Sequence, residues 1–175
     1  MRRNKTVYIA RCALFAALLC LLSPIAIPMG AVPVTLSVFA VMLTALMLDW
    51  KQALAAVGVY ILIGFFGLPV FSAGQGGAAV LFGPTGGYIW SYIPMAWLIS
   101  KFGKGKPPWM AMLASFGGLI ICYICGSAQY ALVSGCGFWA ALGVCVAPFV
   151  VFDVVKAVGA ALFARAIRRR LRDHF

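Results

Sequence analysis

The segment FVVFDVVKAVGAALFARAIRRR, residues 149–170, decides the fold. Its first part, 149–163, is almost entirely apolar, and arginines follow at positions 165, 168, 169, 170 and 172. A helix needs about 20 mainly apolar residues to cross a bilayer. Basic clusters beside such helices mark their cytoplasmic ends. The segment therefore predicts a membrane-spanning helix whose C-terminal end lies in the cytoplasm.

The composition of the whole chain agrees with this reading. Of its 175 residues, 65% are hydrophobic and only 10% are charged, whereas soluble domains carry about 25% charged residues. We therefore expect one integral membrane domain that covers residues 1–175. The net charge is +11, but the basic residues lie in short clusters between apolar runs. This arrangement favours anionic lipid headgroups over nucleic acid as the partner.

The charges also set the number of spans. Basic clusters lie before the first apolar run, after the second, after the fourth and after the sixth, and the other three connections carry no charge. Six spans place every flanking cation on one side, which the positive-inside rule makes cytoplasmic. We predict an all-α, six-helix protein with both termini in the cytoplasm and with spans at about residues 7–27, 34–48, 53–66, 83–99, 109–133 and 138–167.

Two charged residues, Asp153 and Lys156, lie inside the last apolar run. A charge at the bilayer centre costs about 2.5 to 3.5 kcal/mol on insertion scales. Residues three apart share a helix face, so the two charges can neutralise each other. They could form a packing ion pair, or a ligand site or ion relay that faces the protein interior. We favour the second interpretation, because ionisable groups inside membranes are commonly functional. Pro148, one turn earlier, can bend the helix around a cavity.

A second unusual stretch is GLPVFSAGQGGAAVLFGPTGGY, residues 67–88. It contains seven glycines and two prolines between the third and fourth spans. Irregular backbone at membrane depth is tolerated where it is buried or lines a cavity. The stretch could fold over a pocket as a lid, with Gln75 and Thr85 as polar contacts, or it could be an ordinary turn. It contains no phosphate-binding GxxxxGK[ST] loop.

Small residues in the first span give a third signal. Ala10, Ala13 and Ala17 lie in ARCALFAALL, residues 10–19, and Ala13 and Ala17 have the small-xxx-small spacing that lets helices approach closely. Such faces also pack within a single protein. The spacing alone therefore leaves the partner of this face open.

Catalytic and metal sites are not expected. Six cysteines lie mostly in apolar runs, one CxxC pair (Cys122 and Cys125) has no second pair, and the single histidine is His174. These features do not form a zinc site or a redox site. No paired catalytic carboxylates or histidine-based triad occur. We predict no enzyme activity, no catalytic residue, no metal and no cofactor.

Taken together, GLPVF with LFGPTGGY, the AVPVTLS segment at residues 31–37 and the D..K pair of the last span resemble the BioY family. The resemblance extends over nearly the whole chain. That family comprises the biotin-binding S components of energy-coupling-factor (ECF) transporters. The resemblance implies a multi-pass protein of the bacterial plasma membrane that captures biotin. It also implies partner chains, namely a transmembrane coupling subunit and two ATPases that hydrolyse ATP.

The resemblance also assigns roles to residues. It implies that Asp153 and Lys156 contact biotin, that residues 83–88 close the pocket, and that Ala13 and Ala17 dock on the coupling subunit. The chain departs from the family pattern at Ser37, where glutamine is common, and at residues 72–74, where some members have an asparagine. The expected ligand-binding residues are Asp153, Lys156, Gln75, Thr85, Tyr88, Phe71, Thr35 and Gly83, with Trp90 as a further aromatic wall; the expected partner-interface residues are Ala10, Ala13 and Ala17.

Two other functions stay open. The chain could be an S component for another small vitamin, such as thiamine or riboflavin. It could also be a proton-coupled secondary carrier that uses Asp153 as its proton site, in which case uptake would need a pH gradient and no ATPase.

Overall fold

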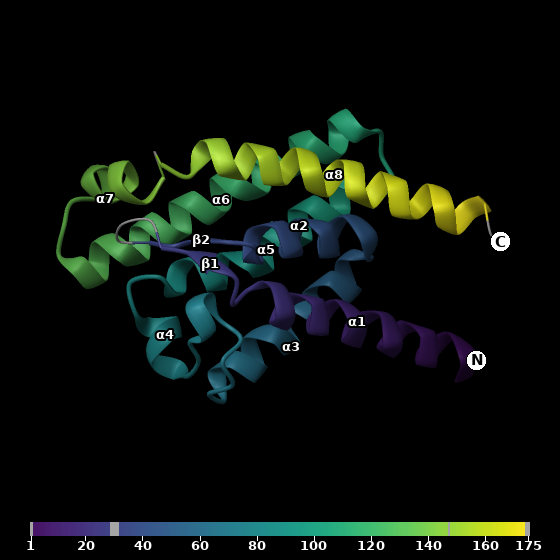
Figure 1. Ribbon diagram of the computed structural model, residues 1–175, viewed down its shortest axis with the longest axis horizontal. Helices are drawn as coiled ribbons and strands as arrows, with labels where there is room; N and C mark the ends of the chain where they lie inside the picture. Colours follow the sequence, from purple (N-terminus) through teal and green to yellow (C-terminus); the bar gives the residue numbers. More distant parts are fainter. Residues whose placement is uncertain (1, 29–31, 147, 174–175) are drawn as a thin grey trace.

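The computed structural model describes residues 2–28, 32–146 and 148–173, and the chain there is mostly helical (Figure 1). Eight α-helices, one short 3-10 helix and one pair of two-residue strands follow one another in these ranges. Their bounds are α1 Arg2–Leu22, β1 Ala26–Ile27, β2 Val34–Thr35, α2 Ser37–Met47, α3 Trp50–Phe65, η1 Ser72–Gly74, α4 Ala78–Phe82, α5 Gly86–Gly103, α6 Pro108–Ser134, α7 Phe138–Cys145 and α8 Val150–Asp173.

Five of the six predicted spans correspond to single helices. The runs at 7–27, 34–48, 53–66, 83–99 and 109–133 form α1, α2, α3, α5 and α6, with boundaries shifted by up to five residues. The sixth, 138–167, is not one helix. The chain breaks after Cys145 and resumes at Val150, and α7 and α8 are inclined at 61° to each other. Pro148 lies in the break, where its missing N–H and fixed φ prevent a continuous helix.

The lengths and apolar character of the helices fit a membrane protein. The segment Lys5–Leu22 of α1 and the whole of α6 are each long and apolar enough to cross a bilayer, and the bent α7–α8 pair is a third candidate. The helices α2 and α3 are apolar but shorter. Many large apolar side chains are exposed, among them Leu132 at 84% and Phe163 at 59%. A chain with such a surface is stable in lipid rather than in water.

Three of the predicted basic clusters come together at one end of the molecule. Lys104, after α5, contacts Asp49, which precedes α3. A Cβ atom built on Gly105 would lie 3.6 Å from the guanidinium of Arg168 in α8. Both described ends of the chain lie at the same end of the molecule (Figure 1). These three connections therefore lie close together at one end of the molecule.

The helix α2 is the centre of the core. Nine of its eleven residues are buried, and it packs against α8, α5 and α1. Ser100 in α5 donates to the carbonyl of Leu48 at 2.7 Å, which fixes the end of α2 against α5. The helices α5 and α6 pack closely because Gly118 leaves room for Met95 and Ile99, whose side chains lie within 3.0 Å of where its Cβ would be.

The all-α prediction did not foresee the strand pair. Ala26 pairs with Thr35 and Ile27 with Val34 in an antiparallel ladder. Prolines at positions 24, 28 and 33 prevent a helix in this segment. Val32 and Val34 pack against Cys145 and Phe149. The strand pair thus lies between α1 and α2 in sequence but contacts the α7–α8 break in space.

Candidate functional site

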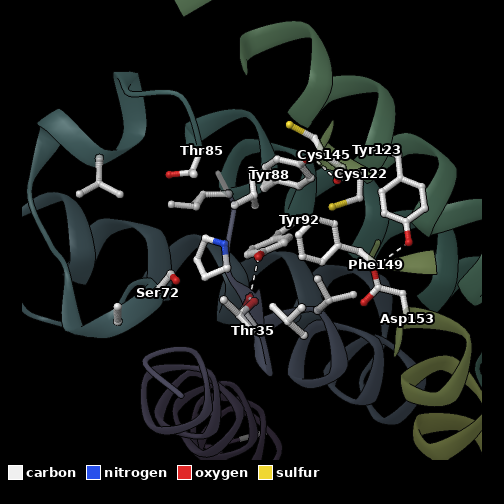
Figure 2. Close-up of a pocket in the computed structure, with 18 of the residues that line it drawn as sticks. Thr35, Ser72, Thr85, Tyr88, Tyr92, Cys122, Tyr123, Cys145, Phe149 and Asp153 are labelled. Carbon is white, nitrogen blue, oxygen red and sulfur yellow. Dashed lines mark hydrogen bonds between the residues drawn. The ribbon is translucent and has the colours of Figure 1, made fainter. Parts of the chain in front are cut away.

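A cavity of about 240 Å³ lies within the bundle, beside the strand pair and the α7–α8 break (Figure 2). A single water needs about 10–15 Å³, so the cavity has room for a small molecule. Its wall comes from almost every part of the chain: Val32, Pro33, Val34, Thr35, Ser37, Val38, Tyr60, Ser72, Ala73, Gln75, Val80, Thr85, Tyr88, Ile89, Tyr92, Cys122, Tyr123, Cys145, Phe149, Asp153 and Lys156.

Asp153 lies at one end of the cavity, one turn into α8. Its side chain is 6% exposed and that of Lys156 is 12% exposed. Lys156 Nζ donates to Asp153 Oδ1 at 2.8 Å, and the hydroxyl of Tyr123 in α6 donates to Oδ2 at 2.7 Å. A buried carboxylate is stable only when it is paired and hydrogen-bonded. Both oxygens of Asp153 meet this requirement, and the resulting triad carries no net charge.

A second polar group lies near the middle of the cavity (Figure 2). The hydroxyls of Ser37 and Tyr92 are 2.7 Å apart, and Thr35 forms a hydrogen bond with Ser37. Thr35 ends β2, Ser37 begins α2 and Tyr92 lies in α5. The strand pair is therefore what brings the Thr35 hydroxyl to the cavity wall.

Aromatic rings form much of the remaining wall. The ring of Tyr88 packs directly on Gly126. A Cβ atom at position 126 would lie 2.4 Å from the ring, so a larger residue would not fit there. The Tyr88 hydroxyl donates to the carbonyl of Cys145 at 3.2 Å. Tyr60, Tyr92 and Phe149 line the cavity and are almost fully buried. Such a wall suits an apolar ligand, while the few hydroxyl and charged groups orient it.

One side chain fixes the segment before α5. Gln129 Nε2, in α6, donates to the carbonyls of Leu81 and Gly83 at 2.9 and 2.7 Å. The indole of Trp90 also donates to the Leu81 carbonyl, at 3.2 Å. Two backbone carbonyls of the GPTGGY region are thus bonded to neighbouring helices rather than to water. The loop that carries Thr85 is held against the bundle.

The structure brings six of the eight predicted ligand-binding residues to this cavity. Two others lie elsewhere, as does Trp90. Phe71 is fully buried and packs edge-on against Tyr60, with ring centroids 5.6 Å apart. Gly83 lies outside the lining, and its carbonyl accepts from Gln129 Nε2 and from the Gly86 N–H. Trp90 also lies outside the lining and is 41% exposed. The six residues in the wall are Thr35, Gln75, Thr85, Tyr88, Asp153 and Lys156.

Several lining residues had no role in the sequence interpretation. Tyr123 is the most consequential, because it bonds the carboxylate of Asp153. A tyrosine in an apolar helix gives no sign of whether it faces lipid, core or cavity. The pair Tyr88 and Tyr92 does offer a signal, since residues four apart share one helix face. Tyr60 and Phe149 are further examples of lining residues without a role in that interpretation.

The alanines of α1 face outward. Ala10, Ala13 and Ala17 are exposed, whereas Ala16 and Leu19 are buried in the core. The small residues therefore form a flat outer strip on α1. The side of α1 that packs within the bundle is the one that carries Ala16 and Leu19.

Within the described residues, no group of three or more histidine, cysteine, aspartate or glutamate side chains is placed to hold a metal ion. All six cysteines are free thiols.

The chain matches the BioY family over residues 1–173. It is 36% identical over 174 residues to biotin transporter BioY2 of Lactococcus lactis, covering 98% of this chain and 95% of that protein. It is 40% identical over 165 residues to biotin transporter BioY of Thermotoga maritima, with 91% and 94% coverage. Its fold matches the crystal structure of the S-component for biotin from an ECF-type ABC transporter, with a TM-score of 0.90, 24% identity and coverage of 97% and 94%.

Proposed function

The chain belongs to the BioY family, and from this premise we propose that it captures biotin in the cavity around Asp153, as the substrate-binding subunit of an ECF transporter. Relatives at 36% and 40% identity are named biotin transporters. The observation that carries the proposal is the buried Asp153–Lys156 pair in the wall of a mostly apolar cavity.

The chemistry of biotin matches this cavity. Its ureido group offers two N–H donors and one carbonyl acceptor, its ring system is apolar, and its side chain ends in a carboxylate. The Asp153–Lys156 pair has no net charge and offers both an acceptor and a donor. It can therefore bind the neutral ureido group without burying excess charge. If the carboxylate of biotin lay beside the pair instead, one buried negative charge would have no balancing positive charge.

We therefore place the ureido group at Asp153 and Lys156 and the valerate chain toward the hydroxyls of Ser72 and Thr85. Figure 2 shows Ser72 and Thr85 on the opposite side of the cavity from Asp153. Biotin methyl ester tests this orientation because it keeps the ureido group and lacks the charged carboxylate. The ester should lose much less affinity than an analogue with an altered ureido group. A larger loss for the ester would reverse the orientation.

Transport itself needs other chains. The sequence contains no GxxxxGK[ST] motif, so we assign ATP hydrolysis to two ATPase partners and coupling to a transmembrane subunit. The exposed strip of Ala10, Ala13 and Ala17 would dock on that coupling subunit, since small residues let helices approach closely. In this scheme the chain crosses the bacterial plasma membrane six times, with both termini in the cytoplasm and no cofactor of its own.

The proposal is tested by binding to the purified protein. Radiolabelled biotin should bind saturably with one site per chain, and excess unlabelled thiamine or riboflavin should not displace it. No saturable binding of biotin, together with saturable binding of radiolabelled thiamine or riboflavin, would identify an S component for another substrate.

A proton-coupled carrier would need Asp153 to exchange protons during transport. Both of its oxygens are already engaged, by Lys156 and by Tyr123, so the geometry favours a fixed binding pair. Uptake into proteoliposomes separates the two mechanisms. The ECF mechanism requires ATP and the partner chains, whereas a carrier would accumulate biotin on a pH gradient without them.

A further inference from the structure

A second cavity, of about 780 Å³, lies at the end of the molecule where both termini are found. It is bounded by the C-terminal part of α8, by the turn between α5 and α6, and by Leu46 of α2. It shares no lining residue with the cavity around Asp153. Among the described residues, its lining includes no carboxylate and four cationic side chains: Lys106, Arg165, Arg168 and Arg169.

These cations are not neutralised by the part of the chain that the structure describes. The ion pairs found there are Lys104–Asp49 and Lys156–Asp153, and neither includes a lining residue of this cavity. Asp49 interacts electrostatically with Arg168, but its carboxylate is in direct contact with Lys104. Four positive charges therefore share one cavity without a matching set of negative charges.

Arg168 carries the clearest indication of a missing partner. Its Nη2 atom is buried and has no hydrogen-bond partner among the described residues. Buried polar groups are nearly always hydrogen-bonded, so an unpaired one needs an explanation. A guanidinium presents its donors in a planar fork that matches the oxygens of a phosphate.

The rest of the wall is apolar. Ala111, Ala161 and Ala164, together with Leu46, lie beneath the cationic rim. A wall with basic and apolar parts suits an amphiphile whose charged head meets the arginines and whose chain follows the alanines. Basic pockets between membrane helices on the cytoplasmic side bind the headgroups of anionic lipids.

We propose that this cavity binds a phosphate group, supplied by an anionic phospholipid of the leaflet that faces the two termini. A soluble phosphate ester would present the same chemistry, and the experiment separates the two sources. Such a lipid would anchor the end of α8 to the α5–α6 turn. This inference concerns a site separate from the biotin cavity and holds whatever vitamin the protein carries.

The test is native mass spectrometry of the purified protein with added lipid. The protein should retain one phosphatidylglycerol molecule in preference to phosphatidylcholine. Arg168→Gln should reduce this retention about tenfold, because charge-assisted hydrogen bonds to phosphate are lost. Lys51→Gln removes one exposed cation near the same end but outside the cavity, and it should change retention less than about twofold.

Arg165→Gln is a second variant, for use if Arg168→Gln does not give a monodisperse protein with the wild-type unfolding temperature. Displacement of the lipid by millimolar inorganic phosphate would keep the phosphate site and assign it to a soluble ligand. Equal retention of the two lipids, or equal losses in the Arg168, Arg165 and Lys51 variants, would overturn the proposal. It would also fail if Arg168→Gln kept the lipid and instead lost a partner subunit on co-purification.

Discussion

The hydroxyl of Tyr123 in α6 donates to Oδ2 of Asp153 in α8 at 2.7 Å. This bond joins two helices across the wall of the cavity and leaves Oδ1 to Lys156. The orientation of the carboxylate therefore depends on α6 as well as on α8. A ligand that binds Asp153 meets an acceptor that is already fixed in place, which lowers the entropy that binding would otherwise lose.

Removal of the Tyr123 hydroxyl should weaken biotin binding without abolishing it. Tyr123→Phe keeps the ring and loses one hydrogen bond to a charged group, which is worth about 1.5 kcal/mol, or roughly a tenfold rise in Kd. Isothermal titration calorimetry on the purified protein measures this change. Tyr130→Phe is the matched control, because Tyr130 lies two turns further along α6 and outside the lining. Equal affinities in the two variants would make the Tyr123 bond irrelevant to binding.

Gln129 should hold the segment before α5 against the bundle. Gln129→Leu removes one of two donors from each of two carbonyls: Gly83 keeps the Gly86 N–H, and Leu81 keeps the Trp90 indole. We expect amide hydrogen exchange over residues 77–85 to become about tenfold faster, because the two hydrogen bonds that join this segment to α6 are lost and each contributes about 0.5–1.5 kcal/mol. Gln129→Glu also lacks the donor and should behave similarly. Unchanged exchange in both variants would contradict this role.

Gly64 should be a position where no side chain fits. A Cβ atom there would lie 2.1 Å from the ring of the fully buried Phe71. Gly64→Ala should therefore destabilise the protein by about 1–3 kcal/mol, the usual cost of overpacking. Thermal unfolding in detergent measures the effect. Gly58→Ala in the same helix meets nothing within 4 Å, so it should be neutral or stabilising by up to about 1 kcal/mol. A Gly64 variant as stable as the Gly58 variant would show that Phe71 moves aside freely.

The alanine strip of α1 should act in assembly and not in ligand capture. Ala13→Trp places a large ring on an exposed face, so biotin affinity should stay within about twofold of wild type while co-purification with the coupling subunit is lost. Ala55→Trp adds the same ring to an exposed position of α3 and should leave the complex intact. Normal co-purification of the Ala13 variant would remove the strip from the interface.

The main helices could be predicted from the sequence because membrane helices are encoded locally. An apolar run of about 20 residues predicts a span without any tertiary information. The break around Pro148 was only partly predictable, because a proline can either kink a helix or end it. The Ala26–Thr35 and Ile27–Val34 pairing was not predictable, because two-residue strands have no periodicity to detect.

The charged part of the candidate site was also predictable, and the aromatic part was predictable only at Tyr88. Asp153 and Lys156 stand out because charges are costly in an apolar run. Tyr123 does not stand out, since an aromatic residue in a membrane helix can face lipid, core or cavity equally well, whereas Tyr92 shares a helix face with the predicted Tyr88. The hydroxyl contacts of Ser37 and Thr35 depend on the strand pair, which brings residues of β2 and α2 to one wall.

The affinity of the Lys156→Ala variant for biotin, measured by equilibrium dialysis, tests the central claim most directly. Loss of one partner of a buried ion pair at a binding site costs about 2–5 kcal/mol, so Kd should rise at least about thirtyfold. Lys104→Ala breaks the exposed pair with Asp49 and should leave Kd within about twofold of wild type. If the Lys156 variant binds biotin as tightly as the Lys104 variant, the Asp153–Lys156 pair only packs the helix and the biotin site lies elsewhere.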